Sequence, residues 1–133
     1  MSDGTFDSLL QAQRELQQES FDTDPIELCG QARAEYIRWN VLALEDELHE
    51  ALQELRWKPW TTPEDQGRWV HRDAYVKELV DALHFLLNLF LVADVQSREV
   101  VDRYFAKREV NAQRQRDGYA GAKDSDGRAT DEP

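Results

Sequence analysis

Two short acidic segments carry residue types and a spacing that could hold a metal ion. Glu47 and Glu50 form the first pair, and Glu78 and Asp81 form the second. In an α-helix, residues three positions apart share a face, with Cβ atoms about 5–6 Å apart. If both segments are helical and face each other, the four carboxylates form a cage of oxygen ligands. Hard oxygen ligands suit Mg²⁺, which binds phosphates alongside the protein.

The surroundings of the second pair favour a metal site over a solvated acidic face. The segment 78–93 is apolar nearly all round, with its few polar residues on one side, so we expect it to be buried. Buried carboxylates are costly unless a positive charge compensates them. For Glu47 and Glu50 alone, the alternative is a solvated helix face, because the apolar stripe that includes Val41 and Leu44 lies elsewhere on that helix.

The composition fits one small domain that does not bind nucleic acid. The chain has 133 residues, 41% of them hydrophobic, and a formal net charge of −11. This is enough for one core but not for a second domain. The negative charge argues against a nucleic-acid surface or an anionic membrane surface. A nucleotide ligand is still possible, because a bound metal ion reverses the local sign of the charge.

The chain shows no sign of secretion or membrane insertion. Its single cysteine, Cys29, cannot form an internal disulfide and favours a reducing compartment, with a buried, inert thiol as the default. No cleavable leader opens the sequence, and the apolar run 85–93 is too short to span a bilayer. We therefore expect a soluble, cytoplasmic protein.

Apolar residues at helical spacing predict four long helices. The predicted helices cover residues 6–19, 31–55, 74–93 and 98–116. No segment alternates like a strand. The expected fold class is all-α, a four-to-five-helix bundle.

Helix ends and domain limits follow from local residue types. Asp24, followed by Pro25, is an expected N-cap, and Asp73 and Ser97 are the expected N-caps of the last two helices. From residue 120 the apolar spacing stops, which predicts a single domain over 1–119 and a disordered acidic tail over 120–133.

The segment 56–72 contains Pro59, Pro63 and Gly67 and is predicted to be a loop. It also holds three tryptophans, which either seal the core or line a planar ligand, and sealing is the favoured alternative. Because so small a chain must cover these rings and a leucine-rich helix, we expect a homodimer.

The last predicted helix is basic although the chain is acidic. Lys107, Asn111 and Arg114 are spaced by four and three residues and therefore project together. Such a cluster is usually a solvated face. Here the acids lie on two other helices, so a polyphosphate with its metal ion would need both groups of residues.

Together, these segments resemble the all-α nucleoside triphosphate pyrophosphatases and, among them, the dimeric dUTPase branch, which is related to MazG-type proteins. The resemblance covers residues 9–119. The matching segments are Glu47/Glu50 with Glu78/Asp81, Trp57-Lys58-Pro59-Trp60, Asp81-Ala82-Leu83-His84-Phe85-Leu86-Leu87, and an ending with Lys107, Asn111, Arg114, Gln115, Gly118 and Tyr119.

The resemblance implies hydrolysis of a deoxynucleoside triphosphate, foremost dUTP, to the monophosphate and pyrophosphate. It implies Mg²⁺, or Mn²⁺ as a substitute, held by the two acidic pairs, with Glu50 or Glu47 as the general base. The implied phosphate ligands are Lys58, Lys107, Asn111 and Arg114, and the implied base and sugar contacts are Gln13, Gln17, Trp60, His84 and Phe85.

One departure from the family pattern bears on base specificity. The family usually has an asparagine a few residues after the glutamine that matches Gln13, and this chain has Gln17 there. A longer amide displaces the hydrogen-bonding pattern that reads a base. Two alternatives to a dUTPase follow: the same chemistry on another nucleotide, such as dCTP or a modified purine nucleotide, or a catalytically silent helical dimer with a regulatory role.

Overall fold

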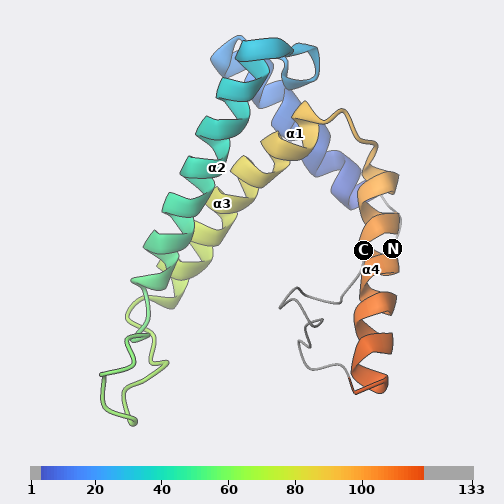
Figure 1. Cartoon of the computed structure of the whole chain (residues 1–133). Helices are drawn as coiled ribbons and strands as arrows, with labels where there is room; N and C mark the ends of the chain where they lie inside the picture. Colours follow the sequence, from blue (N-terminus) through green and yellow to red (C-terminus); the bar gives the residue numbers. More distant parts are fainter. Residues whose placement is uncertain (1–3, 119–133) are drawn as a thin grey trace.

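The computed structural model describes residues 4–118, which form four α-helices and one short 3-10 turn (Figure 1). The elements are α1 (Gly4–Phe21), η1 (Pro25–Glu27), α2 (Gly30–Leu52), α3 (Arg72–Val92) and α4 (Ser97–Arg116). The predicted all-α class is confirmed. Within the described residues, the one β-type pairing is an isolated bridge between Leu55 and Trp69. The proposed tail, 120–133, and Tyr119 lie outside the described residues.

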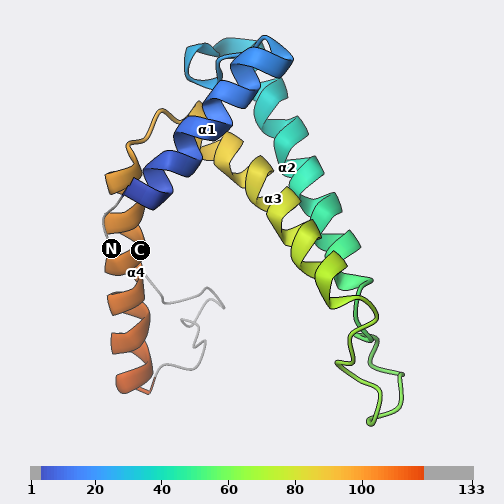
Figure 2. The ribbon, with the colours of Figure 1, turned by 180° about the vertical axis from the view of Figure 1, so that it is seen from behind.

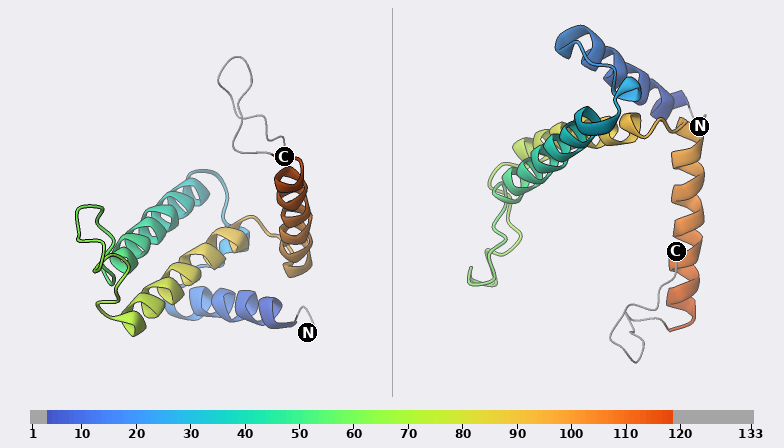
Figure 3. Two further views of the ribbon diagram at one scale, coloured as in Figure 1. Left: turned by 90° about the horizontal axis from the view of Figure 1, so that it is seen from below. Right: turned by 45° about the horizontal axis from the view of Figure 1, so that its top comes forward.

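Helices α2 and α3 run antiparallel along most of their length, as Figures 1 and 2 show. Helix α1 crosses the end of this pair and packs on α3, whereas α4 stands apart from α2. The two views of Figure 3 show the same separation from below and from the tilted top. No residue of α4 is buried. The single chain is therefore a three-helix unit with a fourth helix attached at one end.

The reversal between α1 and α2 depends on Asp24. Its carboxylate accepts a hydrogen bond from the Ile26 backbone N–H at 3.3 Å and pairs with Arg14 at 2.8 Å. The Arg14 guanidinium lowers the pKa of the Asp24 carboxyl below its usual value. Asp24 is thus an N-cap as predicted, although it begins η1 rather than a long helix. Gly30, with φ of +57°, then permits the entry into α2.

Three predicted helix ends are wrong. The N-cap of α3 is His71 and that of α4 is Gln96, neither with a side-chain capping bond, so Asp73 and Ser97 lie within the first turns. Asp73 still interacts favourably there with the positive end of the helix dipole. Helix α2 ends at Leu52 instead of Leu55, because the Arg56 N–H already bonds to the Arg68 carbonyl across the loop.

The core lies where α1 crosses α3. Leu10, Leu87 and Leu91 are buried together, and Phe6 and Phe90 pack against them with ring centroids 6.2 Å apart. Edge-to-face aromatic packing of this kind stabilises a core beyond the burial of its area. These contacts fix α1 on the C-terminal half of α3.

One side of the segment 78–93 is not buried as predicted. Leu79, Val80, Leu83 and Leu86 are all more than a third exposed, whereas Leu87 is 3% exposed. Figure 1 shows that α4 turns away from α3, so it does not cover these side chains in the single chain. The apolar face of α3 is therefore only half covered by its own chain.

We expect Leu87→Ala to lower the free energy of unfolding by about 2–5 kcal/mol, because it removes buried methyl groups and leaves a cavity. Leu42→Ala is the matched control, since Leu42 is 60% exposed. Urea denaturation of both variants measures the difference. Equal losses at the two positions would contradict the placement of the core.

Candidate metal site and adjoining cavity

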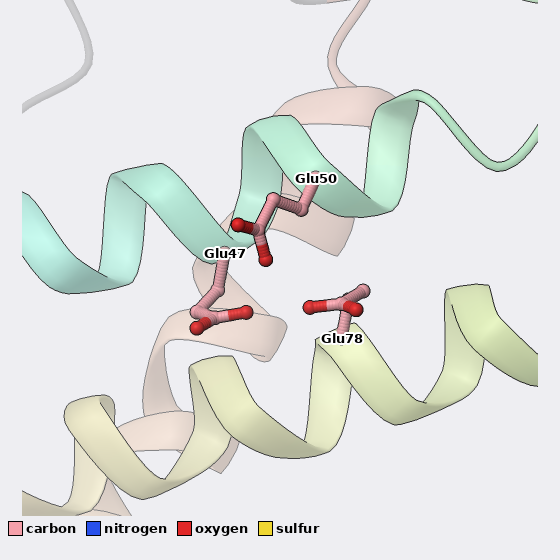
Figure 4. Close-up of side chains that lie close together, drawn as sticks. All are labelled: Glu47, Glu50 and Glu78. Atoms are coloured by element: carbon pink, nitrogen blue, oxygen red, sulfur yellow. The ribbon is translucent and has the colours of Figure 1, made fainter.

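Three carboxylates from two helices converge on one point. Glu47 and Glu50 come from the last turns of α2, and Glu78 comes from the second turn of α3 (Figure 4). Ligand oxygens from the three side chains all lie within 4.8 Å of one another. The three-residue spacing of the first pair and the antiparallel register of α2 and α3 together produce this cluster.

The electrostatics of the cluster show that it is strained by like charge. The pKa of Glu47 is raised to about 7 by its hydrogen bond with Glu78, by desolvation and by Glu50. The neighbouring Glu78 also raises the pKa of Glu50. The pKa of Glu78 is lowered, because Glu47 donates the hydrogen bond to it. Without a cation the three groups share a proton near neutral pH.

The cluster has the chemistry of a divalent-cation site. Glu47 Oε2 is buried and has no hydrogen-bond partner among the described residues. A buried, unpaired carboxylate oxygen is costly, and a hard cation would remove that cost. Three carboxylates are also the donor set that Mg²⁺ and Mn²⁺ accept. The residues present therefore fit such an ion.

Asp81, the fourth predicted ligand, is not part of this cluster. Its carboxylate lies 3.4 Å from Lys77 Nζ, one turn before it on the same helix. Lys77 also lies 3.9 Å from Glu78. Lys77 therefore pairs with both predicted metal ligands of α3, Glu78 and Asp81.

A chain of buried side-chain amides lies two turns away from the acids. Gln13 donates to Asn88 at 2.8 Å, and Asn88 donates to Asn40 at 2.8 Å. Asn40 in turn donates to the backbone carbonyl of Tyr36 at 2.8 Å. At the other end, Gln13 Oε1 lies 2.7 Å from His84 Nδ1. The chain ties α1, α2 and α3 together, and both polar atoms of the Gln13 amide are already engaged.

A cavity of about 640 Å³ opens beside these hydrogen-bonded amides. Gln17, Asn40 and Asn88 give it polar groups, and Trp39 and Phe85 form an aromatic wall with ring centroids 5.9 Å apart. The Tyr36 hydroxyl, which also lines it, donates to Gln17 Oε1 at 2.7 Å. Burial raises the Tyr36 pKa to about 12, so this hydroxyl remains protonated. An apolar cavity with a few placed polar groups is typical of a small-molecule site.

The structure places the predicted base contacts in two separate hollows and leaves Trp60 outside both. Gln17 and Phe85 line the cavity, whereas Gln13 and His84 line a smaller, apolar hollow of about 150 Å³ between α1 and α3. Trp60 lines neither and is 78% exposed at the far end of the molecule, with Lys58 Nζ 5.5 Å from its ring. One chain therefore does not bring Trp60 to the cavity.

The loop tryptophans do not seal the core. Trp57, Trp60 and Trp69 are all exposed, so the favoured prediction for this loop is wrong in the single chain. The loop is instead held by backbone bonds, including one from the Gly67 N–H to the Arg56 carbonyl at 2.7 Å. These bonds need few buried side chains, which leaves the rings free to face outwards.

The predicted phosphate ligands of α4 lie away from the carboxylates. Lys107 and Asn111 are exposed and Arg114 is partly buried on a helix that packs mainly on α1. Lys58 lies beyond the end of α2, beside a hollow it shares with Arg56 and Thr61. The structure therefore does not bring these four residues to the cluster within one chain, and their role stays a prediction.

Sequence reasoning missed three residues that line the cavity: Tyr36, Trp39 and Asn40. The available signal was Asn40, an amide on a helix whose other face is apolar. Asn88 is one of the few polar residues of the apolar segment 78–93, but the spacing of residues does not identify its partner. The contact joins residues 48 positions apart and depends on the packing of α2 against α3.

The all-helical fold fits the all-α nucleoside triphosphate pyrophosphatases that the sequence resembles. In comparisons with known proteins, a family model described as dUTPase matches residues 5–99, and the chain belongs to this dUTPase family. It is accordingly a dUTPase-like nucleotide diphosphatase, a hydrolase. No curated protein and no solved structure matches the chain.

The family match covers the three helices that carry the cluster and the cavity, and it ends as α4 begins. Among residues 4–118, no helix has the length and apolar character needed to cross a bilayer. The cytoplasmic location stays a prediction.

Without divalent cations, we expect the melting temperature to fall as the pH rises from about 5 to about 8. In the folded state the Glu47 pKa is about 7, above its ordinary value of 4.5, so the folded protein binds the extra proton and loses that stabilisation on deprotonation. Thermal melts in chelator across this range measure the slope. Glu47→Gln should flatten the slope, while Glu45→Gln, on the same helix but outside the cluster, should not.

Proposed function

We propose that the chain is a Mg²⁺-dependent dUTP diphosphatase that converts dUTP and water to dUMP and pyrophosphate. The observation that carries this proposal is the three-carboxylate cluster with its unpaired buried oxygen, set beside an aromatic cavity in a chain of the dUTPase family. The proposed metal ligands are the three glutamates of the cluster, Glu47, Glu50 and Glu78, together with Asp81 once it is released from Lys77. One of the α2 carboxylates accepts the proton of the attacking water. Mn²⁺ is the expected substitute.

The bound cations would neutralise phosphate charge and acidify water at the site. The protein supplies the rest. The ion pair between Lys77 and Asp81, at 3.4 Å, must break before Asp81 can bind a metal ion. Lys77 would then add a positive charge near the phosphates, next to Glu78. The raised Glu47 pKa suits a group that exchanges a proton near neutral pH.

The cavity is the proposed base site. Asn40 and Glu47 are seven residues apart on α2, about 10.5 Å along the helix axis, which matches the distance from a base to the phosphates of a nucleotide. Because Gln17 Oε1 accepts the Tyr36 hydroxyl, the Gln17 amino group is left to donate to a base carbonyl. Uracil has a carbonyl at position 4 where cytosine has an amino group, so a donor that reads this position favours dUTP, with dCTP as the alternative.

A homodimer is the proposed assembly. Its support is the uncovered apolar surface of α3 and the exposed Tyr104 and Phe105 of α4. A partner subunit placed on these faces would cover them, and could bring the α4 residues Lys107, Asn111 and Arg114 near the acids. A nucleotide is the proposed ligand, with no nucleic acid involved.

We expect Glu50→Gln to lower dUTP turnover by at least about a hundredfold, because it removes a charge needed for metal or proton transfer. Pyrophosphate release is measured with Mg²⁺, with Glu45→Gln as the control. Turnover within a few-fold of that of the unmodified chain would show that Glu50 neither binds the metal ion nor transfers the proton.

A panel of nucleoside triphosphates, with and without Mg²⁺, tests the substrate. We expect dUTP to give the highest kcat/KM and Gln17→Asn to reduce its preference over dCTP, because the shorter amide changes the donor presented to the base. Faster turnover of another nucleotide would overturn the uracil assignment. Absence of turnover and of thermal stabilisation by Mg²⁺ with any nucleotide would favour a silent regulatory dimer.

Light scattering after size exclusion tests the assembly. We expect twice the chain mass, and expect Leu83→Glu to give the monomer, since Leu83 lies on the uncovered face of α3. Leu42→Glu is a control at a 60% exposed position of α2. A monomer for the unmodified chain would contradict the dimer.

A further inference from the structure

The donor-to-acceptor direction of the hydrogen bonds between the buried amides is fixed at one end, by Asn40. Asn40 lies 2.8 Å from the backbone carbonyl of Tyr36, and a carbonyl can only accept a hydrogen bond. The Asn40 amino group must therefore face it, because turning the amide by 180° would place two acceptors in contact. Asn40 is 2% exposed, so water cannot repair such a contact.

This constraint passes from one amide to the next. With its amino group engaged, Asn40 presents Oδ1 to Asn88, whose Nδ2 must donate at 2.8 Å. Asn88 then presents Oδ1 to Gln13, whose Nε2 must donate at 2.8 Å. Gln13 presents Oε1 to His84 Nδ1 at 2.7 Å, and this nitrogen must carry a hydrogen. Reversing any member would create an acceptor–acceptor or donor–donor contact.

We propose that Asn40 is a positioning residue that, through Asn88 and Gln13, holds His84 as the Nδ1–H tautomer and fixes which amide atoms face the cavity. When the ring is neutral, its lone pair then lies on Nε2, which is available as an acceptor. The two hollows are thereby linked, since Asn40 and Asn88 line the larger one and Gln13 and His84 line the smaller one. Asn40 acts on His84 without touching it.

The consequence for selectivity rests on the proposed function. A base edge is read by the positions of donors and acceptors, and buried groups that cannot rotate reject a mismatched edge more strongly than groups that can. With Asn40 in place, Asn40 and Asn88 present one pattern. Without it, the chain of amides has two possible directions, and discrimination between nucleotides falls.

Nitrogen NMR of the full chain tests the tautomer directly. The chain has three histidines, so His49→Gln with His71→Gln leaves His84 as the single signal. The pH is raised until the nitrogen shifts of the ring no longer change, which gives the spectrum of the neutral ring. We expect the hydrogen on Nδ1 and the lone pair on Nε2. A neutral ring with its hydrogen on Nε2 overturns the proposal, even if no variant of Asn40 folds.

Asn40→Leu in this background removes the anchor and keeps the number and branching of the side-chain heavy atoms. We expect His84 to become a mixture of the Nδ1–H and Nε2–H tautomers, because the Asn88 and Gln13 amides can then adopt both directions. Tyr36→Phe is the matched control: it removes the hydroxyl bonded to Gln17 but keeps the backbone carbonyl, so Nδ1–H should persist. An unchanged tautomer in a folded Asn40→Leu protein contradicts the role of Asn40.

The kinetic measurement separates this inference from the proposed function. In otherwise unmodified protein, Asn40→Leu should lower the ratio of kcat/KM for the preferred nucleotide over its nearest competitor by roughly tenfold or more. An unchanged ratio overturns the effect on selectivity. If the unmodified chain hydrolyses no nucleotide, the proposed function fails, whereas the tautomer result stands on its own.

Discussion

Three glutamates are held together although their charges repel one another, and the rest of the structure serves to keep them there. Within the cluster, the hydrogen bond between Glu47 and Glu78 offsets only part of this repulsion, because Glu50 adds a further like charge. The cost must be offset by the packing of α2 against α3. Groups arranged in advance around the place of a charge are also what makes a site bind or react efficiently, since no rearrangement is needed when the ligand arrives.

The buried amides are the means by which the helices keep their register. Asn40 and Asn88 bond across the α2–α3 interface, and Gln13 adds α1 to the same chain of bonds. A slip of either helix would leave several buried polar groups unpaired at once, which is far costlier than losing apolar contacts. The same bonds that shape the cavity thus stabilise the cluster two turns away.

The sequence predicted the four helices and the approach of three of the four carboxylates, because helical spacing is local. The positions of Glu47 and Glu50 on one face needed only three residues of helix. The pairing of Asp81 with Lys77 is also local. Lys77 can reach both Glu78 and Asp81, however, and residue spacing does not show which of the two it approaches more closely. The exposure of Trp60 and the departure of α4 depend on the assembly of whole elements, and no short pattern encodes them.

The distance between the cavity and the acids has a consequence for how this chain can change in length. Seven residues separate Asn40 from Glu47, and seven separate Glu78 from Phe85. Inserting or deleting one residue in either interval would rotate one end against the other by about 100° and turn its side chain away from the partner helix. Changes in spacing therefore disrupt the site in either interval, whereas the loop after α2 and helix α4 lie outside both intervals.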